Sequence, residues 1–173
     1  MVRRLRGSLF SIVLSGIVSV GCGSSSTQTG STVSAEAEPL TDADKAEITS
    51  FIEEARKNFE NGQDLLFSKK FTNDGKLTPP QAAAAIGKLK IAKLVQKSPK
   101  ITDLTISNID VEGAGKSAVV TGMVAMTGLT NDPDNGNALS VPVSVNCSLL
   151  VTLKKTGNGD WRAKNVACPS LTP

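Results

Sequence analysis

This sequence of 173 residues contains no histidine, no tyrosine and a single tryptophan. Without histidine, a Ser-His-Asp or Cys-His catalytic site cannot form, and neither can a zinc site of the usual His-containing kinds. Aromatic residues make up 3% of the chain, too few for the stacking platform of a sugar-binding or single-strand-binding protein. No glycine-rich phosphate motif follows a strand, and the adjacent carboxylates Glu53 and Glu54 point apart on a helix. The sequence therefore predicts no catalytic residues, no metal and no cofactor, and so a protein that is not an enzyme.

The basic charge of the chain is concentrated in its first six residues. Its 19 Lys and Arg against 16 Asp and Glu give a net charge of +3, and Arg3, Arg4 and Arg6 account for all of that excess. Once the N-terminal segment is removed, the remaining chain is close to neutral. Nucleic-acid binding needs a net basic surface on the mature domain. We therefore predict no nucleic-acid partner.

An apolar run follows these arginines and ends at a cysteine. Residues 9–20 are apolar apart from three serines and a glycine, and such a short run after several cations indicates an export signal. Gly21 and Cys22 then resemble the lipobox of bacterial lipoproteins, although Ser19 stands where that motif usually has leucine. The resemblance implies that Cys22 is lipidated and becomes the mature N-terminus. The alternative is an ordinary secretory signal that is cleaved elsewhere.

The next segment has the composition of a flexible tether. Residues 23–39 are mostly Ser, Thr, Gly and Ala, and such a leash has an average reach of roughly 25 Å. We therefore expect a signal peptide at residues 1–21, a lipidated cysteine and tether at 22–40, and a single domain at 41–173. This organisation predicts a protein of the cell envelope that is anchored to the membrane on its extracytoplasmic side.

Two helices are expected in the first half of that domain. Thr41 and Asp44 resemble a capping box, and apolar residues at helical spacing follow, so the pattern predicts a helix over residues 42–61. A short helical turn near Leu65 and a turn at residues 73–75 come next. Thr78, two prolines and Gln81 then predict a second helix over residues 79–96. One side of this helix carries three lysines: Lys90, Lys93 and Lys97. This side is either exposed to solvent or a surface that binds anionic lipid head groups.

From residue 101 onward, apolar residues recur at every second position, which indicates strands. The alternation shifts by one at Ser107 and Asn108, where we expect a bulge. Residues 117–129 carry apolar side chains on both faces, as a central strand covered on both sides would. Residues 139–153 alternate strictly except at Leu150, as in a half-buried strand, and residues 161–168 return after a glycine-rich turn.

The loop at residues 131–137 is rich in Asp and Asn, the residue types that supply oxygen ligands to calcium. Its spacing fails the EF-hand pattern, because Gly136 comes one place early from Asp132 and no Glu follows at the twelfth position. A plain Asx-rich hairpin loop is the better interpretation.

If Cys22 carries lipid, Cys147 and Cys168 remain as one pair in an oxidising compartment, and we predict a disulfide between them. A two-residue turn at Gly157 would place them directly opposite each other. A three-residue turn would instead place Trp161 on the apolar face. Both conditions hold only if a bulge lies between the turn and the cysteines.

The order of two helices followed by a curved antiparallel meander resembles the cystatin-like cone of nuclear transport factor 2-like domains in small bacterial lipoproteins. Asp160 and Trp161, after a glycine turn, contribute to that resemblance. It implies an α+β fold in which a sheet wraps around a helix and leaves a concavity. The expected lining of this pocket comes from two strands: Met123, Val124, Val141, Val143 and Val145. The alternative is that these side chains simply fill the core under the first helix, because valine and methionine at strand spacing are typical core residues.

We therefore expect a non-catalytic binding or structural module of the envelope. Its partners would be the membrane, through the anchor, and either an envelope protein or a small apolar ligand. The alternative is a small enzyme of the nuclear transport factor 2-like class that works without histidine. A polar cluster inside the cone would indicate the enzyme, whereas an open apolar pocket would indicate a small-molecule binder.

Overall fold

Helix α1, Asp42–Glu60, begins at the predicted residue and ends one residue before the predicted end. The structure is a computed structural model that describes residues 37–80, 82–132 and 138–169. At the N-terminus of α1 the backbone N–H of Asp44 donates to Thr41 Oγ1 at 3.1 Å, and the Asp44 carboxylate accepts from Thr41, which completes a capping box. Asn61 caps the C-terminus, and Gly62 follows with φ +64°, a conformation that glycine adopts without strain.

The segment after α1 forms a short helix and a strand. Helix α2 is Asp64–Lys69 and strand β1 is Phe71–Thr78. The turn that we expected at residues 73–75 is wrong, because these residues lie inside β1. The register of β1 with strand β6, Trp161–Ala167, shifts between Phe71 and Lys76. Gly75 serves close packing here: a Cβ on it would lie 2.9 Å from Phe71 Cβ and 3.0 Å from the Ala163 carbonyl oxygen.

The helix that we expected over residues 79–96 is also wrong in its first half. Only Lys88–Gln96 is helical, as α3, and Ala85–Ile86 forms a short strand, β2, that pairs with β1. Gly87 separates the two with φ +85°, and its N–H donates to the Gly75 carbonyl at 2.8 Å. This pairing with the preceding strand outcompetes the local helical pattern. Gln81, which we expected to complete the cap, lies outside the described residues.

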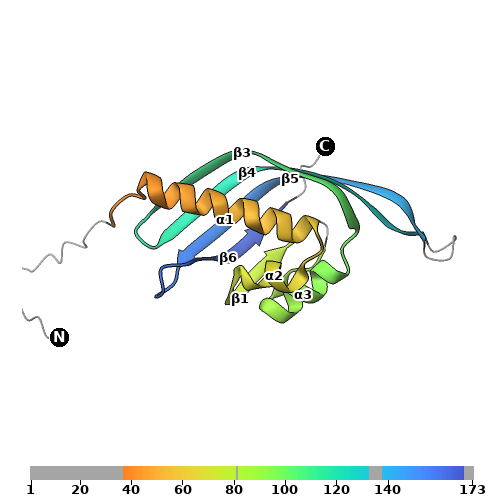
Figure 1. Cartoon of the computed structure of the whole chain (residues 1–173), viewed down its shortest axis with the longest axis horizontal. Coiled ribbons are helices and arrows are strands. Elements are labelled where there is room, and N and C mark those ends of the chain that lie inside the picture. The colour runs from red at the N-terminus through yellow and green to blue at the C-terminus, as the bar shows by residue number, and fades with distance from the viewer. Residues whose placement is uncertain (1–36, 81, 133–137, 170–173) are drawn as a thin grey trace, which may run out of the picture. The chain divides into compact units, whose positions relative to one another are not determined.

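The remaining strands are β3, Lys100–Ala114; β4, Ser117–Asp132; β5, Ala138–Lys155; and β6, Trp161–Ala167. In the described part of the chain, the strands form one sheet in the order β2-β1-β6-β5-β4-β3. Strands β3 to β6 form the expected antiparallel meander, and β1 joins it parallel to β6. The sheet curves, and α1 lies across it, with α2 and α3 near the end of α1 (Figure 1). The α+β class is confirmed.

Strand β3 contains the predicted bulge. Its register with β4 shifts between Ser107 and Asp110, and Asn108 has φ +53°. Asparagine tolerates this left-handed conformation better than most residues.

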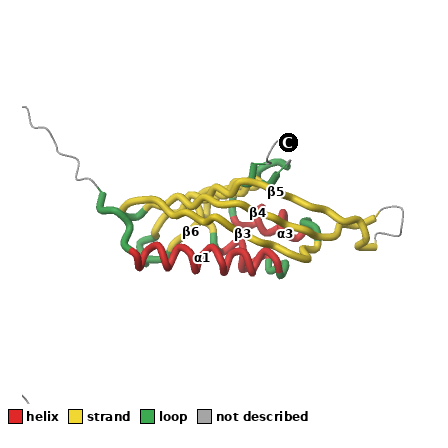
Figure 2. The backbone as a smooth tube through the Cα atoms, turned by 90° about the horizontal axis from the view of Figure 1, so that it is seen from above, coloured by secondary structure: helices red, strands yellow, loops and turns green. Residues whose placement is uncertain are grey.

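Strand β4 is central, but only one of its faces is covered. Val120 is fully buried, whereas Val119, its neighbour on the opposite face, is 39% exposed. On β5 the out-of-phase Leu150 is likewise exposed. The expectation of cover on both faces is therefore wrong, and α1 runs along one side of the sheet (Figure 2).

The last hairpin has the register that buries tryptophan. Trp161 pairs with Lys155 and is 2% exposed, and the register shifts between Thr152 and Leu153, as a bulge requires. This shift does not bring the cysteines opposite each other, because Ala167 pairs with Leu150. Cys168 is therefore offset along β5 from Cys147, yet their Cα atoms are 5.4 Å apart, within disulfide range.

Candidate binding cavity

A cavity of about 480 Å³ lies between α1 and the inner face of the sheet. This volume is within the range of about 300–1,000 Å³ that is typical of small-molecule sites. The sheet contributes alternate residues of β3, β4 and β5, since every second side chain of a strand points to the same face. They are Leu104, Ile106, Val124, Met126, Val143, Val145, Cys147, Leu149 and Val151.

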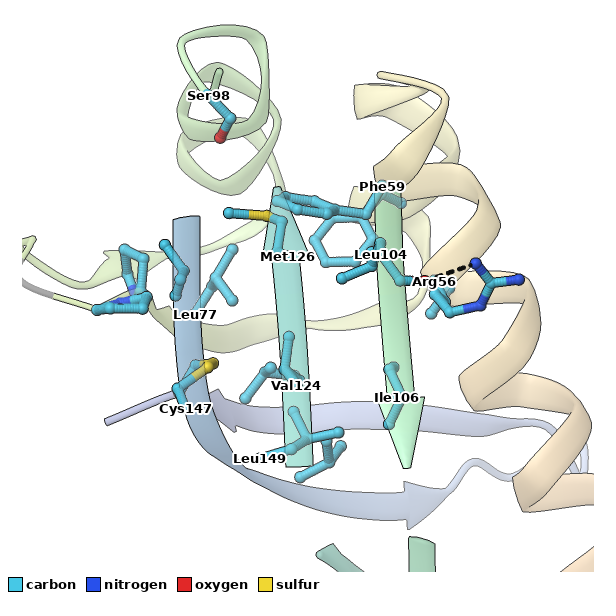
Figure 3. A pocket seen from close by; sticks show the side chains of 18 of the residues that line it. Arg56, Phe59, Leu77, Ser98, Leu104, Ile106, Val124, Met126, Cys147 and Leu149 are labelled. Atoms are coloured by element: carbon cyan, nitrogen blue, oxygen red, sulfur yellow. Dashed lines mark hydrogen bonds between the residues drawn. A yellow bond between two sulfur atoms is a disulfide. The ribbon is translucent and has the colours of Figure 1, made fainter. Parts of the chain in front are cut away.

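Helix α1 supplies the opposite wall through residues on a single face. Phe51, Ile52, Ala55 and Phe59 recur at helical spacing, so they all point toward the sheet. Two aromatic contacts join residues of this lining: the ring centroids of Phe59 and Phe67 are 5.2 Å apart, and those of Phe67 and Phe71 are 5.4 Å apart. Figure 3 shows Phe59 and Leu104 meeting beside Met126, with Val124 and Leu149 farther along the cavity.

The structure places three of the five residues predicted for the lining in this cavity. Val124, Val143 and Val145 line it, whereas Met123 and Val141 do not. Met123 lies on the opposite face of β4 from Val124, because successive side chains alternate. Val141 lies farther along β5, opposite Thr130, and is 39% exposed. Met126 was missed, although it lies two residues from Val124 and so shares its face.

Comparison with solved structures identifies this architecture. An NTF2-like protein with a cystatin-like fold from Novosphingobium aromaticivorans is 18% identical, with a TM-score of 0.61 over 75% of this chain and 82% of that chain. A ketosteroid isomerase-like protein from Erwinia carotovora atroseptica is 20% identical, with a TM-score of 0.63 over 77% of this chain and 100% of that chain. The chain has the NTF2-like, cystatin-like fold.

A further neighbour has a cystatin-like fold and no known function. This protein of unknown function with a cystatin-like fold, from Nostoc punctiforme, is 16% identical, with a TM-score of 0.57 over 76% of this chain and 93% of that chain. No protein-family model matches the chain, and no curated protein matches it. At these identities the likeness shows the NTF2-like fold alone, and the site must be judged from its own residues.

The charged groups that line this NTF2-like cavity are cations, and two of them are already paired. Arg56 bonds Glu53 at 3.1 Å and Glu60 at 2.8 Å, and it donates to the Leu104 carbonyl at 3.0 Å. The hydrogen bond to Glu53 raises the pKa of the Arg56 guanidinium above its ordinary value. Lys70 pairs with Glu54 at 2.5 Å and lies over the Phe51 ring. The third cation is Lys97.

The described lining offers no general acid-base pair. It contains no Asp or Glu, and the glutamates that bond Arg56 and Lys70 are not among the lining residues. A proton transfer would need a positioned donor or acceptor of suitable pKa within hydrogen-bond reach of the substrate. Over the described ranges, no group of three or more Asp, Glu or Cys side chains is placed to hold a metal ion.

The other residues singled out from the sequence fall in different places. Cys147 and Cys168 both line the cavity, so the pair that we predict to be disulfide-bonded forms part of its wall. Cys22 lies outside the described residues, as do residues 133–137 of the loop compared above with a calcium site. Of that loop, Asp132 accepts a hydrogen bond from Ser140 Oγ at 3.3 Å.

Proposed function

We propose that this protein is a lipid-anchored envelope protein whose NTF2-like domain binds an apolar small molecule without catalysing a reaction. The observation that carries the proposal is the cavity of about 480 Å³, walled by side chains of Phe, Leu, Ile, Val and Met. Transfer of apolar ligand surface from water into such a site stabilises a complex by roughly 25 cal/mol per Å².

The polar groups of the cavity favour a binding function and not a catalytic one. Arg56 and Lys70 are held by glutamates of α1, and the described lining contributes no carboxylate to serve as a base. The Erwinia neighbour is called ketosteroid isomerase-like, and an enzyme of that kind is the competing function for this chain. It would require a proton acceptor inside the cone.

Support for the anchor comes from the sequence. Three arginines, a short apolar run and Gly21-Cys22 have the pattern of a lipoprotein signal, and the segment after them has the composition of a tether. No helix among the described residues is long and apolar enough to cross a membrane.

The binding function is tested by filling the cavity. Val145 lines it and Val141 on the same strand does not, so Val145→Trp and Val141→Trp form a matched pair. We expect the neutral fluorescent probe N-phenyl-1-naphthylamine to bind the wild-type chain and Val141→Trp, and to lose most of its affinity for Val145→Trp. Circular dichroism checks that both variants fold. Equal binding to all three proteins, or none to the wild type, would contradict the proposal.

A further inference from the structure

The exposure of the lining residues locates the mouth of the cavity. Among them only Ala82 and Lys97 are exposed, and half-buried Pro80 and Ser98 lie beside them in the sequence. At the other end Leu149, Val151 and Ala163 are buried. Figure 3 shows Ser98 at one end, beyond Met126, and Leu149 near the other. The cavity therefore opens between the segment that follows β1 and the C-terminal end of α3.

Lys97 is the one lining cation without a carboxylate partner in the described part of the chain. Arg56 and Lys70 are neutralised by Glu53, Glu60 and Glu54, whereas Lys97 makes no ion pair with any described residue. It follows the last residue of α3 and is exposed. Its ammonium group is therefore available at the mouth, above apolar walls.

The sequence around Lys97 strengthens this positive charge. Residues 88–100 contain five lysines and no acidic residue. None of these five lysines forms an ion pair within the described ranges. A cluster of one sign beside an apolar opening raises the local concentration of ligands of opposite charge. Interfaces also gain specificity when such potentials are complementary.

We propose that the ligand is a single-chain amphiphile with an anionic head group. Its apolar chain fills the cavity, and its carboxylate or phosphate lies at the mouth beside Lys97. This inference rests on the proposed function, because it specifies the ligand of the same cavity. Burying an anion in the apolar part of the cavity has a large desolvation cost. The head group therefore stays at the opening beside Lys97, and the apolar chain enters the cavity first.

The test compares ligands that differ only in the head. The assay uses the full chain carrying Cys22→Ala, which has no attached acyl group to compete. It measures how well each of three ligands displaces bound N-phenyl-1-naphthylamine: hexadecanoate, hexadecanol and a hexadecanoyl lysophosphatidate. Hexadecanoate represents a free fatty acid and the lysophosphatidate a phospholipid product. We expect at least one of the two anions to bind more tightly than the alcohol, and the tighter of them identifies the source.

The variant Lys97→Glu provides the second arm, with Lys90→Glu as its matched control. Both exchange a lysine for glutamate near α3, but Lys90 does not line the cavity and lies about 10 Å along the helix, beyond one Debye length in physiological salt. We expect Lys97→Glu to weaken anion binding about threefold to tenfold and to leave hexadecanol binding unchanged. Lys90→Glu should also leave hexadecanol binding unchanged, and it should weaken anion binding clearly less than Lys97→Glu does, because salt screens a charge at that distance from the head group.

The outcomes separate the two proposals. If hexadecanol binds as tightly as both anions and Lys97→Glu affects none of them, the anionic head group is overturned while the apolar binding function stands. If no ligand displaces the probe, the proposed function fails as well.

Discussion

Asp44 links the start of α1 to the end of β5. Its carboxylate accepts hydrogen bonds from Thr41 Oγ1 at 2.7 Å and from Lys155 Nζ at 2.7 Å. The bond from Lys155, followed by that from Thr41, lowers the pKa of Asp44 to about 2. Lys155 also lies over the Trp161 ring, so this one contact ties the helix cap, the hairpin and the buried indole together.

The variant Asp44→Asn should lower the free energy of unfolding at neutral pH. Because the pKa of Asp44 is lower in the folded chain than in the unfolded one, its contribution is present above about pH 4. The contribution is lost as the pH falls through about 2, the folded-state pKa. The difference between wild type and variant should therefore shrink between pH 4 and pH 2. Urea unfolding across this range measures it.

Asp42→Asn is the control for this prediction. Asp42 lies in the same helical turn, is exposed and makes no hydrogen bond within the described ranges. The variant Asp42→Asn should therefore leave the free energy of unfolding nearly unchanged. An equal effect of both variants at pH 7 would show that the helix dipole, and not Lys155, makes Asp44 stabilising.

Cys147 and Cys168 contribute to the cavity wall, and their separation of 21 residues sets the expected effect of a disulfide. Cys168→Ser should lower the free energy of unfolding by about 3 kcal/mol. Reduction of the wild-type protein should have the same effect. Alkylation of unreduced protein, followed by mass spectrometry, checks the bond directly. Two alkylated thiols in protein from its native compartment would refute it.

At the scale of elements, the β3–β4 hairpin depends on a close backbone approach. Gly113 pairs with Ala118, and a Cβ on it would lie 2.3 Å from the Ser117 carbonyl oxygen and 2.8 Å from Ala118 Cα. The same hairpin holds the segment before α1, since Gly115 N–H donates to the Glu38 carbonyl at 2.7 Å. This backbone hydrogen bond holds the turn against the residues that lead into the helix.

The variant Gly113→Ala should lower the free energy of unfolding by about 2 kcal/mol or more, because the obstructing atoms belong to the backbone. The matched control is Gly157→Ala. Gly157 lies in the β5–β6 turn, and a Cβ there would meet nothing within 4 Å. Thermal unfolding of the two variants compares them. Similar melting temperatures would show that the hairpin relaxes around the added methyl group.

These elements also show which parts of the fold can be predicted from sequence. Helix α1 carries its own start signal in Thr41 and Asp44, and β5 carries its own alternation, so both are local properties. The helix predicted for the segment before α3 is wrong because Ala85 and Ile86 pair with β1. The helical pattern of that segment gives no sign of this pairing. The parallel pairing of β1 with β6 escaped prediction for the same reason.

The cavity was predictable only in part. Strand alternation identifies Val124, Val143 and Val145 as residues of one sheet face, but it cannot show where the concavity ends, so Val141 was included and Met126 missed. The position of Lys97 at the mouth depends on how α3 packs against β1 and α2, which is a tertiary property. Its lack of a carboxylate partner among the described residues is likewise visible only in three dimensions.

For the whole molecule, the proposed anchor and the proposed cavity act together: a binding domain on a tether works at a distance from the membrane that holds it. Replacing Cys22 with Ala should release the protein from membrane fractions and abolish incorporation of labelled fatty acid. Cys168→Ser is the matched control, because it removes a different cysteine and should leave the protein membrane-bound. Retention of Cys22→Ala in the membrane, with no label in the wild type, would exclude the anchor.

The most direct measurement of the central claim is a methyl NMR titration of the full chain carrying Cys22→Ala with hexadecanol, a ligand without charge. The account predicts saturable shifts of the methyl groups of Val124, Val143 and Val145, which line the cavity. Val119, on the other face of β4, and Val141, beyond the cavity, should not shift. Shifts that never saturate, or that occur at Val119 and Val141 while the three cavity valines stay unchanged, would contradict it.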